Sequence, residues 1–295
     1  MRTLAAILTE TGHPLTIDEI TIPSLKKGQV LVEIKYSGVC QNQLQETRGY
    51  RGKDEYLPHC LGHEGSGVVI EVGEGVEKVK QGDHVILSWI KGSGANVLGT
   101  QYDWNGKKVN AGSITTFSCY SVISENRVTP ISKNFPLREA AFIGCAIPTG
   151  FGTIFNTAQP KPGQSIAIFG CGGVGLCALK GAVIAGCIPI IAIDIHENKL
   201  EYARQMGATH VINASKEDPL ESIKSICSLD FAIEASGSPV AMDQALKAVR
   251  GQGGCAVVIG NARFGSKLSL DPKELNQGKR LLGTWGGDNT PDIHY

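Results

Sequence analysis

The sequence predicts an α/β chain in two domains, a β-rich domain followed by a parallel, doubly wound sheet. Short apolar runs between glycine, proline and aspartate turns fill the first half, which is typical of strands. In the second half, strand-like and helix-like segments alternate, which is typical of a parallel sheet with crossover helices. The pattern changes near Pro148, so we expect one domain over residues 1–148 and another over residues 149–295.

Strands are predicted in the first domain where apolar residues cluster or alternate with polar ones. They cover residues 4–8, 29–36, 67–72, 84–88 and 117–122. Residues 91–113 are polar, contain glycine and show little periodicity, so we expect an excursion over the surface. A helix is predicted from about Asn134, with Pro136 in its first turn, where a missing N–H group is tolerated.

The second domain is predicted to contain strands joined by helices. The strands cover residues 165–169, 188–194, 209–213, 230–234, 254–260 and 280–285, and the helices between them include residues 198–206 and 239–250. Strands connected in this way lie parallel in one sheet with helices on both faces. A ligand of such a sheet binds across the carboxyl ends of its strands.

Residues 165–199 predict a βαβ unit with a phosphate-binding turn. The first strand ends in Gly170-Cys-Gly-Gly-Val-Gly175, and a helix follows. Gly170 permits the tight turn, Gly172 lets a pyrophosphate approach the backbone, and Gly175 lets the helix pack against the strands. The phosphates would lie on the free N–H groups of the helix N-terminus, where Gly173 and Val174 stand.

Asp194 indicates which dinucleotide the turn binds. It ends the second strand of the unit, where its carboxylate is expected to accept both hydroxyl groups of an adenosine ribose. The same charge would repel a 2′-phosphate, so we expect NAD(H) rather than NADP(H). Lys199 has two interpretations, a contact to the same ribose or a solvated lysine on a helix.

The composition restricts the kind of partner. The chain has 28 acidic and 28 basic residues, which gives no indication of nucleic acid or an anionic membrane as a partner. The N-terminal apolar run is too short for a signal peptide, and no apolar stretch reaches the length of a membrane span. Nine cysteines without a Cys-x-x-Cys pair indicate reduced thiols. We therefore expect a cytoplasmic protein.

Three residues of the first domain are candidate metal ligands. They are Cys40, His63 and Cys145. Each of them taken alone is more often a buried structural residue. Two thiolates and one imidazole together form a donor set that suits zinc and leaves a fourth coordination position open.

At these positions the sequence resembles the zinc-dependent medium-chain alcohol dehydrogenases, a family of the medium-chain dehydrogenase/reductase superfamily. The resemblance extends in order from the N-terminus to about Trp285. It is carried by Gly38-Val-Cys40, Gly62-His-Glu-Gly-Ser-Gly67, Gly144-Cys145 with Pro148-Thr-Gly150, and the turn from Gly170 to Gly175 followed by Asp194.

The resemblance implies a GroES-like catalytic domain with one catalytic zinc ion. In this family Cys40, His63 and Cys145 would hold the ion, and Glu64 would be a nearby carboxylate that can enter the coordination sphere. Trp89 would line the substrate pocket. The implied reaction is hydride transfer between NAD(H) and an alcohol or polyol, or the corresponding carbonyl compound.

The resemblance also implies a Rossmann domain that binds the cofactor. Thr149 would stand beside the nicotinamide, and the turn at residues 170–175, Asp194 and Lys199 would bind the rest of the dinucleotide. Dimers and tetramers are usual in this family, so a homodimer or homotetramer is expected.

Two departures from the family pattern concern the structure. Many relatives have a structural zinc site with four cysteines where this chain has residues 91–113, a stretch that contains no cysteine. We therefore expect one zinc ion per chain and a shorter polar hairpin or loop in place of that lobe.

The chain also stops a few residues after the sixth strand, whereas relatives return to the first domain. We expect truncation, with residues 288–295 as the beginning of the return.

A third departure from the family pattern concerns the route by which the proton of the substrate alcohol leaves the site. Relatives usually have Ser or Thr two residues after the first cysteine ligand, and this chain has Asn42, whose amide donates a hydrogen bond but relays no proton at ordinary pH. Gln43 and Gln45 replace an acid and a histidine of the family pattern. The proton would then leave through water, the nicotinamide ribose or His59, although packing is the favoured interpretation of His59.

Two other functions stay open from the sequence. A metal-free reductase of the same fold would act on enones or quinones, but relatives of that kind lack the three candidate ligands. A dinucleotide-binding protein with little turnover is the other alternative, and Asn42, Gln43 and Gln45 are the residues that favour it.

Overall fold

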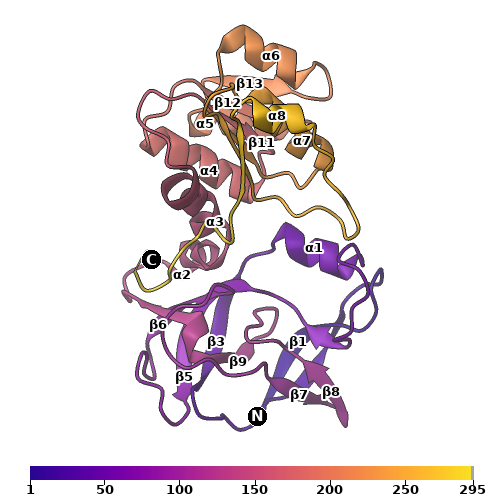
Figure 1. The fold of residues 1–295 in the computed structure, drawn as a ribbon. Helices are drawn as coiled ribbons and strands as arrows, with labels where there is room; N and C mark the ends of the chain where they lie inside the picture. The colour runs from indigo at the N-terminus through magenta and orange to yellow at the C-terminus, as the bar shows by residue number, and fades with distance from the viewer. Residues whose placement is uncertain (294–295) are drawn as a thin grey trace. The chain divides into compact units, whose positions relative to one another are not determined.

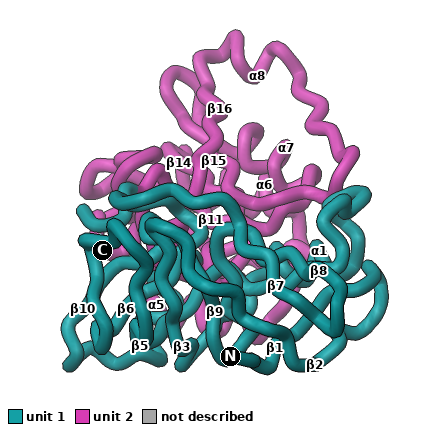
Figure 2. Tube along the Cα trace, turned by 90° about the horizontal axis from the view of Figure 1, so that it is seen from below, with its two compact units in different colours: residues 1–145, 290–295 teal, residues 146–289 magenta. Residues whose placement is uncertain are grey.

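The computed structural model describes residues 1–293 of the chain, which divide into two compact units. The first unit comprises Met1–Cys145 together with residues 290–293, and the second comprises Ala146–Asn289. Figure 2 shows them in different colours. The division falls three residues before Pro148, where the sequence pattern changes. The described residues after Asn289 are grouped with the first unit. They fall within the range 149–295 predicted for the second domain, and within residues 288–295, which we expected to begin a return to the first.

The first unit consists of a five-stranded sheet and a small closed barrel (Figure 1). The sheet has the order β10-β6-β5-β3-β9, and the barrel has the order β1-β2-β7-β8-β4. Their strands are β1 Arg2–Leu8, β2 Thr16–Thr21, β3 Gln29–Ser37, β4 His59–Cys60, β5 Glu64–Val72, β6 His84–Ser88, β7 Gln101–Trp104, β8 Lys107–Asn110, β9 Tyr120–Ser124 and β10 Val128–Ile131. The helices are α1 Gln41–Thr47 and α2 Leu137–Ala140, followed by a 3-10 turn at Ala141–Gly144.

Apolar packing explains why the strands of the five-stranded sheet fold together. In the sheet, valine-rich stretches of β3, β5 and β6 pack around Val30, Val32, Val85 and Leu87, which are fully buried. β-branched side chains suit such a half-buried pleated surface. The strands predicted at residues 4–8, 29–36, 67–72, 84–88 and 117–122 are confirmed within a few residues at their ends.

The prediction that residues 91–113 form a surface excursion is wrong. Within this stretch β7 and β8 form a hairpin of the barrel, and Tyr102 and Val109 are buried in its core. Asn105 and Gly106, both with positive φ, make the two-residue turn between the strands. A polar hairpin thus stands in this stretch, as the comparison with the zinc lobe of relatives led us to expect.

The loop before this hairpin is held by the buried carboxylate of Glu125. The side chain accepts hydrogen bonds from the backbone N–H groups of Ala95 at 2.7 Å, Glu77 at 2.8 Å and Lys78 at 3.0 Å. Burial opposes the charged form, but these donors keep the pKa of Glu125 below its ordinary value. One carboxylate therefore ties two loops to the end of β9.

The second unit is a six-stranded parallel sheet with the order β13-β12-β11-β14-β15-β16. Its strands are β11 Ile166–Phe169, β12 Ile190–Asp194, β13 His210–Asn213, β14 Phe231–Glu234, β15 Cys255–Val258 and β16 Arg280–Gly283. Its helices are α3 Ala146–Gly152, which continues as a π-helical turn at Thr153–Ala158, α4 Gly173–Ile184, α5 Glu197–Met206, α6 Pro219–Ile226, α7 Pro239–Ala248 and α8 Pro272–Asn276. The predicted doubly wound sheet with six strands is confirmed.

Alternation along β11 shows how both faces of this sheet are buried. Ile166 and Ile168 pack with α4 and α5 on one face, while Ala167 and Phe169 pack with α6 and α7 on the other. Successive side chains of a strand point to opposite faces, so a strand covered on both sides is apolar throughout. This is why residues 166–169 form a continuous apolar run. None of the helices in the described part of the chain is long and apolar enough to cross a membrane.

We predict that Glu125→Gln destabilises the first unit by about 1–3 kcal/mol at pH 7, because an amide offers one acceptor oxygen and leaves a buried N–H group without a partner. Since the pKa of Glu125 is lower in the folded chain, its stabilisation is present above its ordinary value of 4.5 and is lost as the pH falls through the folded value. Denaturant unfolding of wild type and variant between pH 3 and pH 7 measures the difference. An equal difference at every pH would contradict this assignment.

Candidate functional site

Strand pairing in the first unit brings the four candidate metal-binding residues together. Cys40 is the N-cap residue of α1, and His63 and Glu64 stand where β5 begins. Because β3 pairs with β5, the segment that follows β3 lies beside the start of β5. On its other side β5 pairs with β6, where Ser88 Oγ donates a hydrogen bond of 2.7 Å to the carbonyl of the residue before Cys145.

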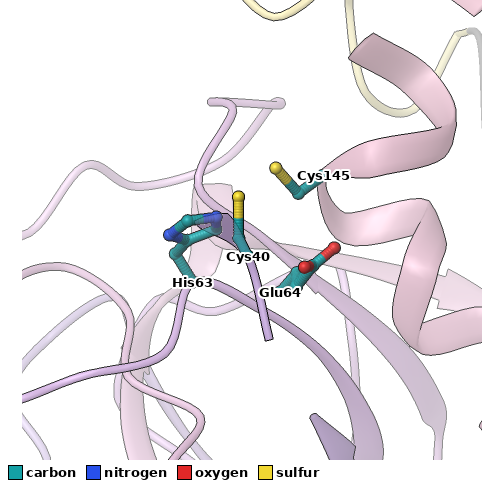
Figure 3. Close-up of side chains that lie close together, drawn as sticks. All are labelled: Cys40, His63, Glu64 and Cys145. Atoms are coloured by element: carbon teal, nitrogen blue, oxygen red, sulfur yellow. The ribbon is translucent and has the colours of Figure 1, made fainter. Parts of the chain in front are cut away.

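The ligand atoms of these residues converge on one point. One ligand atom from each of Cys40, His63, Glu64 and Cys145 lies within 4.8 Å of every other. Figure 3 shows the two sulfur atoms and the imidazole ring facing one another, with the carboxylate alongside. Atoms that bind one zinc ion at about 2.0–2.3 Å are separated by at most about 4.6 Å. The arrangement is therefore close to the size of a zinc coordination sphere.

Gly38 explains why Glu64 can lie beside the cysteines. A Cβ atom at residue 38 would meet Glu64 Cδ at 2.6 Å and Glu64 Oε1 at 2.7 Å. The missing side chain leaves room for the carboxylate two residues before Cys40. Glu64 is itself buried. The glycine of the Gly38-Val-Cys40 motif is thus explained by the space that the Glu64 side chain occupies.

Each of the two cysteines and the histidine shifts the pKa of at least one of the others. A hydrogen bond from the Cys145 thiol lowers the pKa of Cys40 to about 4, against the effect of burial, and His63 contributes to the same shift. The pKa of Cys145 is raised, because its proton is shared with the Cys40 sulfur and because it is buried. Burial lowers the pKa of His63, but the neighbouring Cys40 thiolate raises it above its ordinary value.

This donor set fits a zinc ion. The buried Nε2 atom of His63 has no hydrogen-bond partner among the described residues, which costs free energy unless a ligand supplies one. A divalent cation would give this atom a partner and would replace the proton that the two sulfur atoms share. Zinc bound in this way releases protons, so its affinity falls with falling pH.

Trp89 and Asn42 both lie beside the cysteines. Trp89 follows β6, and a hydrogen bond from its side chain favours the charged form of Cys145. The guanidinium of Arg127 donates to the backbone carbonyl of Trp89. Asn42 stands in the first turn of α1, where its backbone N–H group lowers the pKa of Cys40. Both residues are therefore placed to affect the sulfur atoms.

The glycine turn of the second unit has the geometry of a phosphate-binding loop. Gly170 follows β11 with a φ of +96°, and Gly172 is the N-cap residue of α4. A Cβ atom at Gly172 would meet nothing within 4 Å, whereas a Cβ atom at Gly175 would lie 1.8 Å from the carbonyl oxygen of Gly170. Open space at the helix N-terminus fits a pyrophosphate. The turn therefore fits a dinucleotide.

Asp194 holds the turn as well as facing the expected ribose position. It ends β12, and its carboxylate accepts hydrogen bonds from the N–H groups of Cys171 at 2.8 Å and His196 at 3.0 Å. The ammonium group of Lys199 lies 3.8 Å from the same carboxylate. In α3, the buried Oγ1 atom of Thr149 has no hydrogen-bond partner among the described residues. Each predicted cofactor residue thus lies on the turn, on β12, on α3 or at the start of α5.

A second group of ionisable side chains in the first unit was not predicted from the sequence. Glu46, Asp54 and His59 offer ligand atoms within 4.8 Å of one another. They come from α1, the following loop and β4, so no local motif connects them. The favoured interpretation of His59 as a packed residue agrees with its burial in β4.

Comparisons with known proteins give consistent results over nearly the whole chain. A model of the alcohol dehydrogenase GroES-like domain matches residues 26–133, and a model of the zinc-binding dehydrogenase domain matches residues 173–294. An S-(hydroxymethyl)glutathione dehydrogenase of Synechocystis is 35% identical, covering 97% of this chain and 86% of the relative. The enzyme of the same name from Saccharomyces cerevisiae is 32% identical, covering 97% and 83%.

Solved structures agree with these matches. The crystal structure of benzyl alcohol dehydrogenase from Acinetobacter calcoaceticus has a TM-score of 0.89 at 31% identity, covering all of this chain and 87% of that one. An alcohol dehydrogenase zinc-binding domain protein from Burkholderia ambifaria has a TM-score of 0.90 at 30% identity, covering 99% and 86%.

Two glycine variants test the dinucleotide turn. We predict that Gly172→Ala leaves the free energy of unfolding within about 0.5 kcal/mol of wild type but weakens NADH binding at least about tenfold, since the added methyl group occupies only the space of the pyrophosphate. Gly175→Ala should instead destabilise the second unit by about 1–3 kcal/mol or more, because the methyl group meets backbone. NADH fluorescence titration and denaturant unfolding separate the effects. Unchanged NADH affinity in Gly172→Ala would contradict the assignment.

Proposed function

Since the chain belongs to the zinc-dependent medium-chain alcohol dehydrogenase family, we propose that Cys40, His63 and Cys145 hold one catalytic zinc ion and that Glu64 is an additional, exchangeable ligand. The family activity is hydride transfer between NAD(H) and an alcohol or its carbonyl product. The convergence of one imidazole and two thiol groups within 4.8 Å is the observation that carries the proposal.

The protein contributes charge and geometry at the metal. A bound zinc ion supplies Lewis acidity, which lowers the pKa of an alcohol at the open position. Cys40 and Cys145 balance the charge of the ion, and the buried surroundings strengthen every electrostatic interaction there. The hydrogen bond from Trp89 favours the thiolate form of Cys145, and the same side chain is proposed to border the substrate.

In the second unit, Asp194 is proposed to select NAD(H). Its carboxylate would accept the ribose hydroxyl groups and repel a 2′-phosphate, with Lys199 beside it. The N–H groups at Gly173, Val174 and the following turn of α4 would bind the pyrophosphate. Thr149, with its unsatisfied hydroxyl, is proposed to contact the nicotinamide, which accepts or supplies the hydride.

Water and the nicotinamide ribose are the proposed routes for the substrate proton. The side-chain amide of Asn42 does not accept and release a proton at ordinary pH, and the same holds for the amide of Gln45. Both ring nitrogens of His59 are engaged with Asp54 and with the carbonyl of Cys60, which argues against a relay through His59.

The names of the relatives suggest substrates to test. S-(hydroxymethyl)glutathione and benzyl alcohol both carry a CH2OH group, on sulfur in the first and on an aromatic ring in the second, and polyols or sugar derivatives are the further class that we propose. We also propose a cytoplasmic homodimer or homotetramer. The nine cysteines are all free thiols, which agrees with a reducing compartment.

The direct test is metal analysis combined with turnover of the full chain. We predict about one zinc ion per chain, lost in Cys40→Ser and in Cys145→Ser, and NADH formation from at least one of S-(hydroxymethyl)glutathione, benzyl alcohol and a polyol. Zinc without turnover of any alcohol or carbonyl compound would favour a dinucleotide-binding protein. Reduction of enones without zinc would favour the metal-free reductase.

A variant of Asn42 tests the proton route. We predict that Asn42→Ser raises alcohol oxidation near neutral pH several-fold, because a hydroxyl group relays a proton and an amide does not. Asn42→Ala serves as the control, since it removes the amide without adding a hydroxyl group. An equal rate in the serine and alanine variants would show that residue 42 takes no part in proton release.

A further inference from the structure

A second polar cluster of the first unit lies between α1 and the segment that leads to His63. It comprises Gln43, Glu46, Asp54 and His59, and the proposed reaction uses none of them. The side chains of His59 and Asp54 are only 9% and 10% exposed, and Gln43 is buried as well. Polar groups that are removed from water to this extent must satisfy one another.

His59 is the centre of the cluster. Its Nε2 atom lies 2.7 Å from Asp54 Oδ2 and 3.9 Å from Glu46 Oε1, and its Nδ1 atom lies 3.1 Å from the carbonyl oxygen of Cys60. Cys60 and Asp54 thus occupy the two ring nitrogens, and the carboxylate of Glu46 lies beside Nε2 but beyond hydrogen-bond distance. The imidazole therefore lies beside a carboxylate of the loop and one of α1.

Gln43 extends the cluster to the backbone beside the candidate metal ligand. Its Nε2 atom donates to Glu46 Oε2 at 2.9 Å, and its Oε1 atom accepts the N–H group of Gly62. An amide supplies the donor and the acceptor that these two partners need. A carboxylate in its place would face the carboxylate of Glu46 and repel it. These two contacts explain why residue 43 is a glutamine in this chain, although relatives commonly have an acid at this position.

The connection runs from one proposed zinc ligand to another. Gln43 and Glu46 belong to α1, which begins directly after Cys40, and Gly62 directly precedes His63. We propose that Gln43, Glu46, Asp54 and His59 form a positioning bracket that fixes His63 relative to Cys40 and thereby sets the affinity of the metal site. This inference rests on the proposed function, since it takes Cys40 and His63 as ligands. The four residues are positioning residues, because none of them contacts the reacting atoms.

Exchange of the two partners inside the bracket tests the proposal. Gln43→Glu places two carboxylates against each other, and we expect zinc affinity to fall about 10- to 100-fold, the usual range for groups that support a metal ligand. The double variant Gln43→Glu/Glu46→Gln restores one amide and one carboxylate with their positions exchanged. Zinc affinity in the double variant should return to within about threefold of wild type. Chelator competition at one fixed pH measures all three proteins.

Glu125→Gln is the matched control for a general loss of stability. It removes a buried carboxylate of the same unit from backbone donors that do not belong to the bracket. We expect this variant to unfold at lower denaturant concentration but to bind zinc within about threefold of wild type. Equal losses of zinc affinity in Glu125→Gln and Gln43→Glu, or no recovery in the double variant, would overturn the bracket.

Other results separate this inference from the proposed function. If wild type binds zinc and oxidises an alcohol while Gln43→Glu keeps wild-type affinity, only the bracket fails. If wild type binds no zinc, both fail. Two zinc ions per wild-type chain, one of them lost in Asp54→Asn, would identify Asp54, Glu46 and His59 as metal ligands and overturn the bracket.

Discussion

The convergence of Cys40, His63, Glu64 and Cys145 on one point is the constraint that the candidate site of the first unit has to satisfy. The hydrogen bond between the two cysteines lowers the pKa of Cys40 and raises that of Cys145, and burial opposes the charged form of both thiols. Such a pair is poorly stabilised by its surroundings unless a cation takes the place of the proton. The strands β3, β5 and β6 place the sulfur atoms there, and the neighbouring Glu64, His63 and Trp89 all act on the same charge. The sheet, held together by its apolar core, thus brings the residues of one small site together.

Asp194 has a comparable double role in the second unit. Its carboxylate fixes the glycine turn through two backbone N–H groups, and its position at the end of β12 is where a ribose would bind. In the proposed cofactor site, selectivity for the dinucleotide and the shape of the turn would thus be coupled through one side chain. A substitution that relaxes selectivity at this position also loosens the turn, which is a constraint on any change of cofactor.

The sequence was sufficient to predict those elements of the fold in which apolar residues form a run or a regular pattern. Apolar runs such as residues 166–169 are buried on both faces, so their pattern alone indicated a parallel sheet. The candidate zinc residues were identified by their type and by the motifs around Cys40, His63 and Cys145. The pattern of residues 91–113 did not indicate the strands β7 and β8, because a strand of four residues with one buried side chain, Tyr102, gives too little periodicity. The bracket was also beyond prediction, since the role of Gln43 depends on a backbone group 19 residues away.

We have proposed that one imidazole and two thiolates of the first unit bind a catalytic zinc ion. X-ray absorption spectroscopy of the zinc-loaded chain reports the number and type of the ligand atoms. We expect two sulfur atoms at about 2.3 Å, with nitrogen or oxygen atoms at about 2.0–2.2 Å completing the coordination sphere. A spectrum with four sulfur ligands, or with none, would contradict it.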